Sequence, residues 1–142
     1  MIRYLLDTSA CVDYLRRPGS PMRGWLGSVD PGSVRLCSVV QAELLLGVQK
    51  KPTERNRRNV SRFLAFFPDS YPFDRAAAEI YARLRADLEM RGQAIGPHDT
   101  QIAAIALSRG AVLVTGNSGE FRRVPGLQCL ALDELAAGRA PS

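Results

Sequence analysis

Histidine, lysine and tryptophan are scarce in this sequence of 142 residues. It contains one histidine, His98, two lysines, Lys50 and Lys51, and one tryptophan. A ribonuclease that works without a metal ion commonly uses two histidines for acid–base chemistry, so the single histidine excludes that mechanism. The glycine-rich patterns GxxxxGK[ST] and GxGxxG are also missing, which argues against a nucleotide-binding enzyme.

Cysteine and long apolar runs are limited too. The three cysteines, Cys11, Cys37 and Cys129, are far apart and form no CxxC pair, so neither a disulfide framework nor a zinc site is expected. No apolar run reaches the 18 residues that a membrane span needs, and the start MIRYLLDTSA is unlike a secretory signal. We therefore expect a cytoplasmic protein with no membrane partner.

The remaining composition is that of a globular protein. Hydrophobic residues make up 46% of the chain and charged residues 23%, and the length suits one domain. The net charge of +5 comes almost entirely from arginine. This charge favours a partner that carries phosphate groups, although a GC-rich genome would also enrich arginine.

Short apolar segments alternate with segments of helical periodicity. Strands are expected at 2–6, 34–38, 111–115 and 127–132, with a shorter one at 71–73. Helices are expected at 9–17, with Ser9 as N-cap, at 39–49, 53–67 and 74–92, from 97 to the SRG at 108–110, and at 133–138, while 116–121 reads as a loop. The alternation predicts an α/β fold with a parallel sheet covered on both faces, as one domain over 1–142 with its core at about 2–132 and a short C-terminal tail.

Four polar residues lie where ligands bind in such folds, beyond the carboxyl ends of the strands. Asp7 ends the first strand, Glu43 lies just over a turn into a helix, Asp99 begins another helix, and Asn117 follows the 111–115 strand. Each also has a purely structural interpretation. Asp7 and Asp99 can stabilise helix N-termini, and Asn117 can serve in a turn.

Glu43 and Asp99 are unusual because apolar residues surround them in sequence. Asp99 shares a helix face with Ile102, Ala103 and Ala106, and the helix of Glu43 is apolar nearly all round. A buried glutamate needs a partner. If Asp7, Glu43 and Asp99 stood about 5 Å apart, each pair would repel by roughly 3 kcal/mol, which protonation or a cation must relieve. Carboxylate oxygens suit Mg²⁺ or Mn²⁺.

Four motifs resemble those of PIN-domain ribonucleases, specifically the VapC toxins of bacterial toxin–antitoxin pairs. They are LLDTSACVDYLR, SVVQAELLLG, IGPHDTQIAAIAL and LVTGNSGEFRRVPGL, in the family's order and approximate spacing. The resemblance covers Ile2 to about Leu132. It implies an α/β/α sandwich, a Mg²⁺- or Mn²⁺-dependent endoribonuclease that cuts tRNA or ribosomal RNA at selected sites, a homodimer, and inhibition by a VapB-like antitoxin.

The resemblance also assigns site residues. Asp7, Glu43 and Asp99 take the positions of the catalytic and metal-binding acids, and Asn117 takes a fourth position that is often aspartate. Because asparagine brings no charge, a second metal ion is in doubt, and Glu120 is an alternative fourth ligand. Thr8, Ser9 and Ser38 are expected to orient the ligands, whereas Thr115 is expected to close a strand. Arg122 and Arg123 lie close in sequence to Asn117, so we expect them to contact RNA near the cleaved bond.

Two further interpretations stay open. The stretch KKPTERNRRNVSR is strongly basic, and it is either a solvated helix face or an electrostatic contact surface for RNA. A PIN-like protein that binds RNA or protein without cutting is the alternative to an enzyme, and an RNA cleavage assay with Mg²⁺ separates the two.

Overall fold

The computed structural model describes residues 1–136, in which the strands form one parallel sheet. The strands are β1 (Tyr4–Leu6), β2 (Val34–Arg35), β3 (Val112–Thr115) and β4 (Cys129–Ala131), in the spatial order β2-β1-β3-β4. Every residue of β3 and β4 is buried, as expected for strands covered on both faces.

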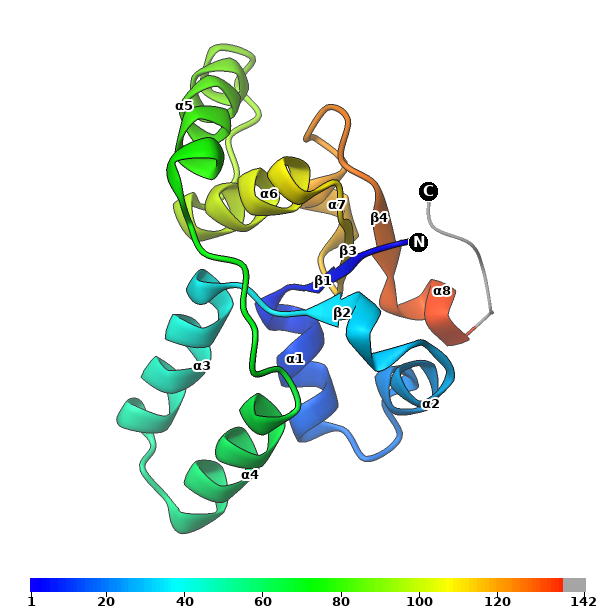
Figure 1. Cartoon of the computed structure of the whole chain (residues 1–142). Coiled ribbons are helices and arrows are strands. Elements are labelled where there is room, and N and C mark those ends of the chain that lie inside the picture. Colours follow the sequence, from blue (N-terminus) through cyan, green and yellow to red (C-terminus); the bar gives the residue numbers. More distant parts are fainter. Residues whose placement is uncertain (137–142) are drawn as a thin grey trace.

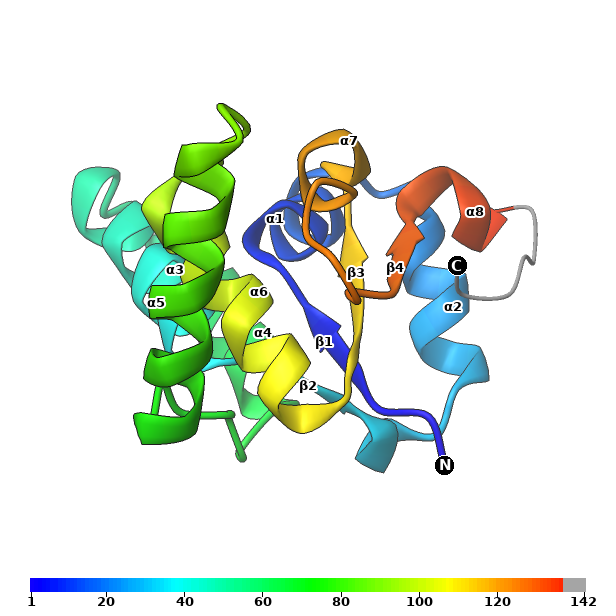
Figure 2. The same ribbon diagram turned by 90° about the horizontal axis from the view of Figure 1, so that it is seen from above.

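Helices cover both faces of this sheet. Figures 1 and 2 show α6, backed by α5, on one face and α1 with α2 on the other, while α3 and α4 pack together to one side. The predicted α/β/α sandwich is therefore confirmed. The helices are α1 (Thr8–Arg16), α2 (Pro21–Ser28), α3 (Ser38–Lys50), α4 (Glu54–Ala65), α5 (Arg75–Met90), α6 (Pro97–Arg109), α7 (Ser118–Phe121) and α8 (Leu132–Ala136), with a 3-10 turn η1 (Pro31–Ser33).

The ends of α6 follow from its sequence. Gly96 is the N-cap and Pro97 the first helical residue, as predicted from the GPHD stretch. Gly110 ends the helix with φ +60°, a left-handed conformation that glycine adopts without strain. Between these ends, Ile102 to Ala106 are buried against the sheet and α5.

Several predicted elements were wrong in detail. Asp7, not Ser9, is the N-cap of α1, because its carboxylate accepts the Ala10 N–H. No strand forms at 71–73, where Tyr71 makes a single bridge to Cys37. The 116–121 loop contains α7, and α2 was missed although Ser20 caps it and Pro21 begins it. Part of the predicted tail helix, 137 and 138, lies outside the described residues.

The sheet register determines which side chains meet at its edge. Leu6 pairs with Val114, so Asp7, just beyond the end of β1, lies beside Thr115, the last residue of β3. Within residues 1–136, no helix combines the length and apolar character that a membrane crossing requires.

Candidate active site

Asp7 is the most buried acid of the predicted site, with 2% of its surface exposed. Its Oδ1 accepts hydrogen bonds from Ser9 Oγ at 2.7 Å and from the Ala10 N–H at 2.8 Å, and its Oδ2 accepts one from Thr115 Oγ1 at 2.5 Å. Burial raises the pKa of Asp7, and these hydrogen bonds oppose the rise. The donors therefore hold a desolvated carboxylate in one orientation.

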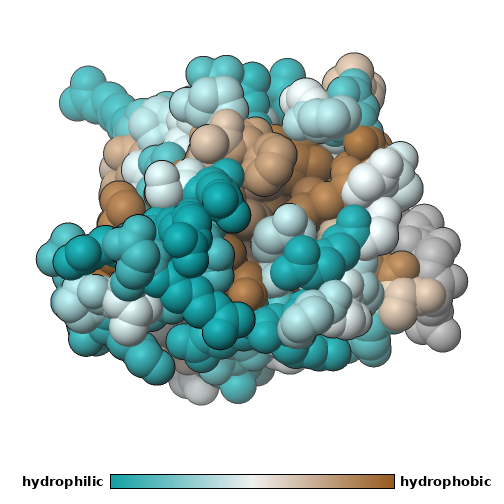
Figure 3. All heavy atoms as spheres, turned by 90° about the horizontal axis from the view of Figure 1, so that it is seen from below, coloured by the Kyte–Doolittle hydropathy of each residue, from teal (hydrophilic) through white to brown (hydrophobic). Residues whose placement is uncertain are grey.

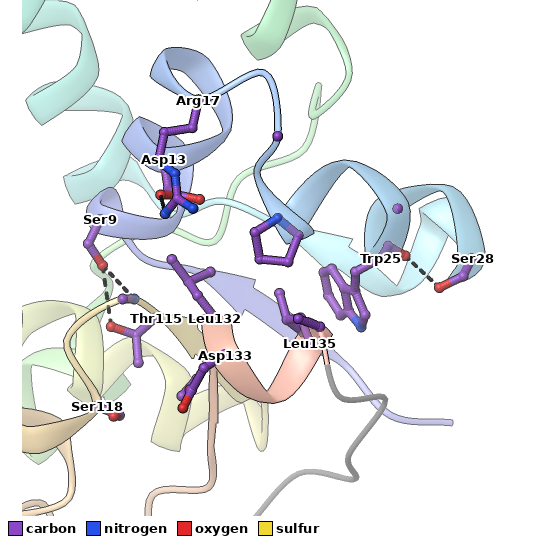
Figure 4. Close-up of a pocket in the computed structure, with 16 residues that line it drawn as sticks. Ser9, Asp13, Arg17, Trp25, Ser28, Thr115, Ser118, Leu132, Asp133 and Leu135 are labelled. Carbon is purple, nitrogen blue, oxygen red and sulfur yellow. Dashed lines mark hydrogen bonds and ion pairs between the residues drawn. The ribbon is translucent and has the colours of Figure 1, made fainter.

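The hydroxyls of Ser9 and Thr115 link Asp7 to the end of β3. Figure 4 shows these two hydroxyls in contact with each other. Ser9 Oγ accepts the Gly116 N–H at 2.8 Å, and Thr115 Oγ1 accepts the Asn117 N–H at 2.8 Å. A Cβ at position 116 would come within 3.3 Å of Ser9 Oγ, so glycine permits this close approach. Ser9 thus contacts the site as predicted. Thr115 closes β3 as predicted, but its hydrogen bond to Asp7 was missed.

Asp99 is half-buried in the first turn of α6. Its pKa is raised to about 6, first by burial and then by the negative charges of Asp7, Glu120 and Glu43, with His98 opposing the rise. It occupies the third helical position that the capping interpretation requires, yet its carboxylate accepts no hydrogen bond from any group within residues 1–136. A capping hydrogen bond therefore does not explain this residue, although its position in the first turn still suits the helix dipole.

Glu43 lies on α3 beside the start of α1. Its Oε1 accepts a hydrogen bond from Thr8 Oγ1 at 2.7 Å, and its Oε2 lies 3.7 Å from His98 Nδ1. The prediction that Glu43 is buried was wrong. Its side chain is 29% exposed, and Leu45 and Leu46 on the same helix are each 50% exposed. The apolar sequence of α3 thus reflects an exposed apolar surface as well as core.

Asp7, Asp99 and Asn117 line one open cleft of about 530 Å³, together with Thr8, Ser9 and Arg16. Asn117 precedes α7, and its side chain makes no capping hydrogen bond to that helix. Glu120 on α7 lies close enough to Asp99 to raise its pKa. The structure therefore brings the two aspartates and Asn117 around one space, with Glu43 and Glu120 nearby.

The acids are not gathered at the distances of a formed metal site. Among residues 1–136, no three aspartate, glutamate, histidine or cysteine side chains stand ready to hold one ion. Asp7 and Glu43 instead accept hydrogen bonds from hydroxyl groups, and the three acids do not form a close cluster. The available donors are still carboxylate and amide oxygens, the chemistry that Mg²⁺ and Mn²⁺ prefer.

Three other predicted residues have partners away from the cleft. Ser38 Oγ accepts the Phe73 N–H at 3.2 Å, which fixes the start of α3. Arg122 lies 3.6 Å from Glu134 on α8, and Arg123 donates to the Ala94 carbonyl at 3.3 Å. These contacts anchor neighbouring segments of the fold.

Comparison with known proteins places the chain in a family. The family model of the PIN domain matches residues 4–127. The chain is 34% identical over 129 residues to the tRNA(fMet)-specific endonuclease VapC of Shigella flexneri, across 90% of this chain and 96% of that protein. It is 35% identical over 126 residues to ribonuclease VapC2 of Rickettsia felis, across 87% and 93%.

Solved structures agree with this placement. The VapBC2 structure of Rickettsia felis, bound to a DNA fragment from its promoter, matches with a TM-score of 0.82 and 33% identity over 92% of this chain and 98% of that chain. The VapBC-1 structure from nontypeable Haemophilus influenzae matches with a TM-score of 0.81 and 27% identity over 94% and 99%. The family match and the relatives' identity show that this chain belongs to the PIN-domain family, in its VapC group.

Proposed function

We propose that this protein is a metal-dependent endoribonuclease and the toxin of a toxin–antitoxin pair. The observation that carries the proposal is the cleft where buried Asp7 and the half-buried Asp99, which accepts no hydrogen bond from residues 1–136, face Asn117. Relatives named as tRNA(fMet)-specific endonucleases make initiator tRNA the first substrate to test. We expect it to act in the cytoplasm. Expression in cells followed by mapping of cleaved RNA 5′ ends would identify the RNA and the cut site.

In the proposed hydrolysis, different residues bind the metal ion, orient its ligands and orient the attacking water. Asp7 and Asp99 would hold Mg²⁺ or Mn²⁺, with the Asn117 carbonyl oxygen as a neutral donor. A bound divalent ion lowers the pKa of water and neutralises charge that develops on the phosphate. Ser9 and Thr115 orient Asp7, while Glu43, which accepts a hydrogen bond from Thr8, would orient the attacking water. Because water attacks phosphorus and the 3′ oxygen leaves, the products are a 5′-phosphate and a 3′-hydroxyl.

Asn117 limits how much positive charge the free cleft can hold. Asp7, Glu43 and Asp99 carry a combined charge of −3, which suits one divalent ion better than two. Asn117→Asp adds a charge with little change in shape and should strengthen metal binding by on the order of 1 to 3 kcal/mol. We expect the variant to reach half-maximal cleavage at a Mg²⁺ concentration at least about tenfold lower than the wild type needs. A Mg²⁺ titration of the cleavage rate measures this change.

Glu120→Gln is the matched control for that titration. If Glu120 already supplies the fourth charge, Glu120→Gln will raise the Mg²⁺ requirement and Asn117→Asp will change little. If neither variant shifts the titration, neither side chain lies near the ion.

An antitoxin partner is the second part of the proposal. The structural neighbours include VapBC complexes, and an acidic cleft attracts a basic side chain from an inhibitory segment. An apolar hollow of about 360 Å³, lined by Tyr14, Leu26 and Phe63 and visible in Figure 3, offers a second contact surface for the antitoxin, with Phe66 72% exposed beside it.

Co-expression with the adjacent small gene should give a pair that cleaves RNA at least about tenfold more slowly than the free chain. Equal rates would refute inhibition by cleft occupation.

We also propose that the protein is a homodimer. Leu45 and Leu46 are each 50% exposed on α3, which gives a second copy an apolar surface to cover. Light scattering after size-exclusion chromatography should report twice the monomer mass, and Leu45→Ser with Leu46→Ser should shift it to the monomer.

A further inference from the structure

Most arginines of the described chain are engaged by neighbours. Arg17, Arg109 and Arg122 pair with acids, as do two arginines of α5 and Arg91 at its C-cap, and others donate to carbonyls or lie over tyrosine rings. Within residues 1–136, the basic side chains that make no such contact are Arg16, Lys50, Lys51, Arg55, Arg57, Arg58, Arg62 and Arg83. All except Arg83 lie at the end of α1, at the end of α3 or on α4. We call these seven side chains the basic surface.

The arginines of α4 are distributed around the helix in a regular way. Phe63 is buried, and Asn56, Asn59 and Val60 are partly buried beside it. Arg55, Arg58 and Arg62 are spaced by three and four residues, so they share one exposed stripe next to Asn59. Arg57 lies on the opposite flank, near Val60. Glu54 is the one acid of this helix, so the stripe has little local neutralisation.

A groove joins the basic surface to the candidate active site. It has a volume of about 170 Å³ and is lined by Thr8 and Glu43 at the site and by Lys51, Asn56 and Asn59 at the α3–α4 side. Arg16 lines both this groove and the cleft of Asp7 and Asp99. Figure 1 shows α1, α3 and α4 together on this side of the sheet, and Figure 3 shows hydrophilic side chains gathered there.

The acids around the cleft and the arginines of the basic surface have opposite effects on an RNA backbone. Around the cleft, the acids Asp7, Asp13 and Asp99, with Glu43 and Glu120 nearby, outnumber the lining arginines Arg16 and Arg17, so the acidic part of the cleft repels a phosphate backbone. Unpaired arginines a short distance away create the opposite potential and draw a polyanion to the same face. Guanidinium groups bind phosphate oxygens in a bidentate manner, and the groove asparagines add neutral hydrogen-bonding groups.

We propose that Arg16 and the stripe of Arg55, Arg58 and Arg62 bind the phosphate backbone of the RNA on one side of the cleaved bond. The strand runs from the acidic cleft past Arg16 and along the groove to α4. This inference rests on the ribonuclease function proposed above. Because no aromatic side chain interrupts the stripe, the contacts bind backbone and contribute affinity rather than base selection.

Steady-state cleavage of an initiator tRNA transcript tests the proposal. Arg55→Ala/Arg58→Ala/Arg62→Ala should raise KM at least about tenfold with kcat unchanged, and Arg16→Ala should raise KM by itself. Each lost phosphate contact lowers the slope of log KM against log salt concentration by about 0.7, so the triple variant should lose about 2. Arg83→Ala is the control and should match the wild type, because Arg83 is also exposed and makes none of these contacts but lies on α5, away from the basic surface.

The outcomes separate this inference from the proposed function. Wild-type cleavage with unchanged KM and salt slope in the triple variant would overturn the RNA path and leave the nuclease intact. If the wild type does not cleave, fluorescence anisotropy with the labelled transcript in EDTA still measures binding, and equal affinity of wild type and triple variant overturns the path. If the triple variant keeps the wild-type KM for RNA but no longer binds the antitoxin, the stripe contacts protein and the RNA path is overturned. All substituted side chains are exposed, and thermal unfolding confirms that each variant is folded.

Discussion

Asp99→Asn should reduce RNA cleavage by on the order of a thousandfold while the protein remains folded, a loss comparable to removal of a main electrostatic group at other active sites. Asp99 faces the cleft and accepts no hydrogen bond from residues 1–136, so the substitution removes a charge without breaking a contact of the fold. Cleavage of the tRNA transcript at saturating Mg²⁺ measures the loss. Undiminished cleavage would return Asp99 to a structural role at the start of α6.

The same substitution should stabilise the metal-free protein at high pH. Folding raises the pKa of Asp99 from 3.8 to about 6, so the folded state binds more protons in this range and stability falls as pH rises through it. At pH 8 the wild type carries the full penalty, roughly 1 kcal/mol once solvent screening of this half-exposed group is allowed for, whereas asparagine carries none.

Thermal unfolding in EDTA checks this expectation. Asp99→Asn should unfold about 4 °C above the wild type at pH 8, and the difference should vanish below about pH 4. Asp69→Asn, which removes an exposed acid outside the cleft, is the control. If the difference in unfolding temperature were the same at every pH, the higher stability of Asp99→Asn would not come from the ionisation of Asp99.

Thr115→Val should lower cleavage at pH 7 by about 10- to 100-fold, the range typical of groups that orient a metal ligand. The Thr115 hydroxyl donates to buried Asp7 and accepts the Asn117 N–H, and valine of similar shape does neither. Because this hydrogen bond lowers the pKa of Asp7, its loss should move the acid limb of the pH profile of kcat/KM to higher pH.

Thr115→Ser is the matched control, since it keeps the hydroxyl and should restore both rate and pH profile. A purely structural role for Thr115 would lower the unfolding temperature without moving the acid limb. An unmoved acid limb in Thr115→Val would therefore contradict a positioning role for this residue.

Local chemistry in the sequence was sufficient to predict α6 and its acid. Gly96 and Pro97 begin the helix as their conformational preferences dictate, and the apolar run behind them is buried. The unusual position of the Asp99 carboxylate on an apolar helix face could also be recognised from the spacing of neighbouring residues. These features depend on residues within a few positions of each other.

Features that depend on distant segments could not be predicted in this way. Thr115 meets Asp7 only because β1 and β3 are adjacent with Leu6 opposite Val114, and strand order is not encoded locally. Glu43 was expected to be buried because apolar residues surround it, but packing leaves one side of α3 exposed, with Leu45 and Leu46 on it. The ion pair between Arg122 and Glu134 of α8 likewise joins distant segments, and the contact of Arg122 with RNA stays a prediction.

The most direct test of the proposed nuclease is the metal dependence and end chemistry of cleavage by the purified, antitoxin-free protein. Initiator tRNA is incubated with the wild type in Mg²⁺ or in EDTA, beside Asp7→Asn as the inactive control, and the product ends are identified by ligation and phosphatase treatment. The cleft of Asp7 and Asp99 predicts cleavage in Mg²⁺ alone, with 5′-phosphate and 3′-hydroxyl ends. Cleavage that persists in EDTA, or products with 2′,3′-cyclic phosphate ends, would contradict it, and binding without any cleavage would identify a PIN-fold module that does not cut RNA.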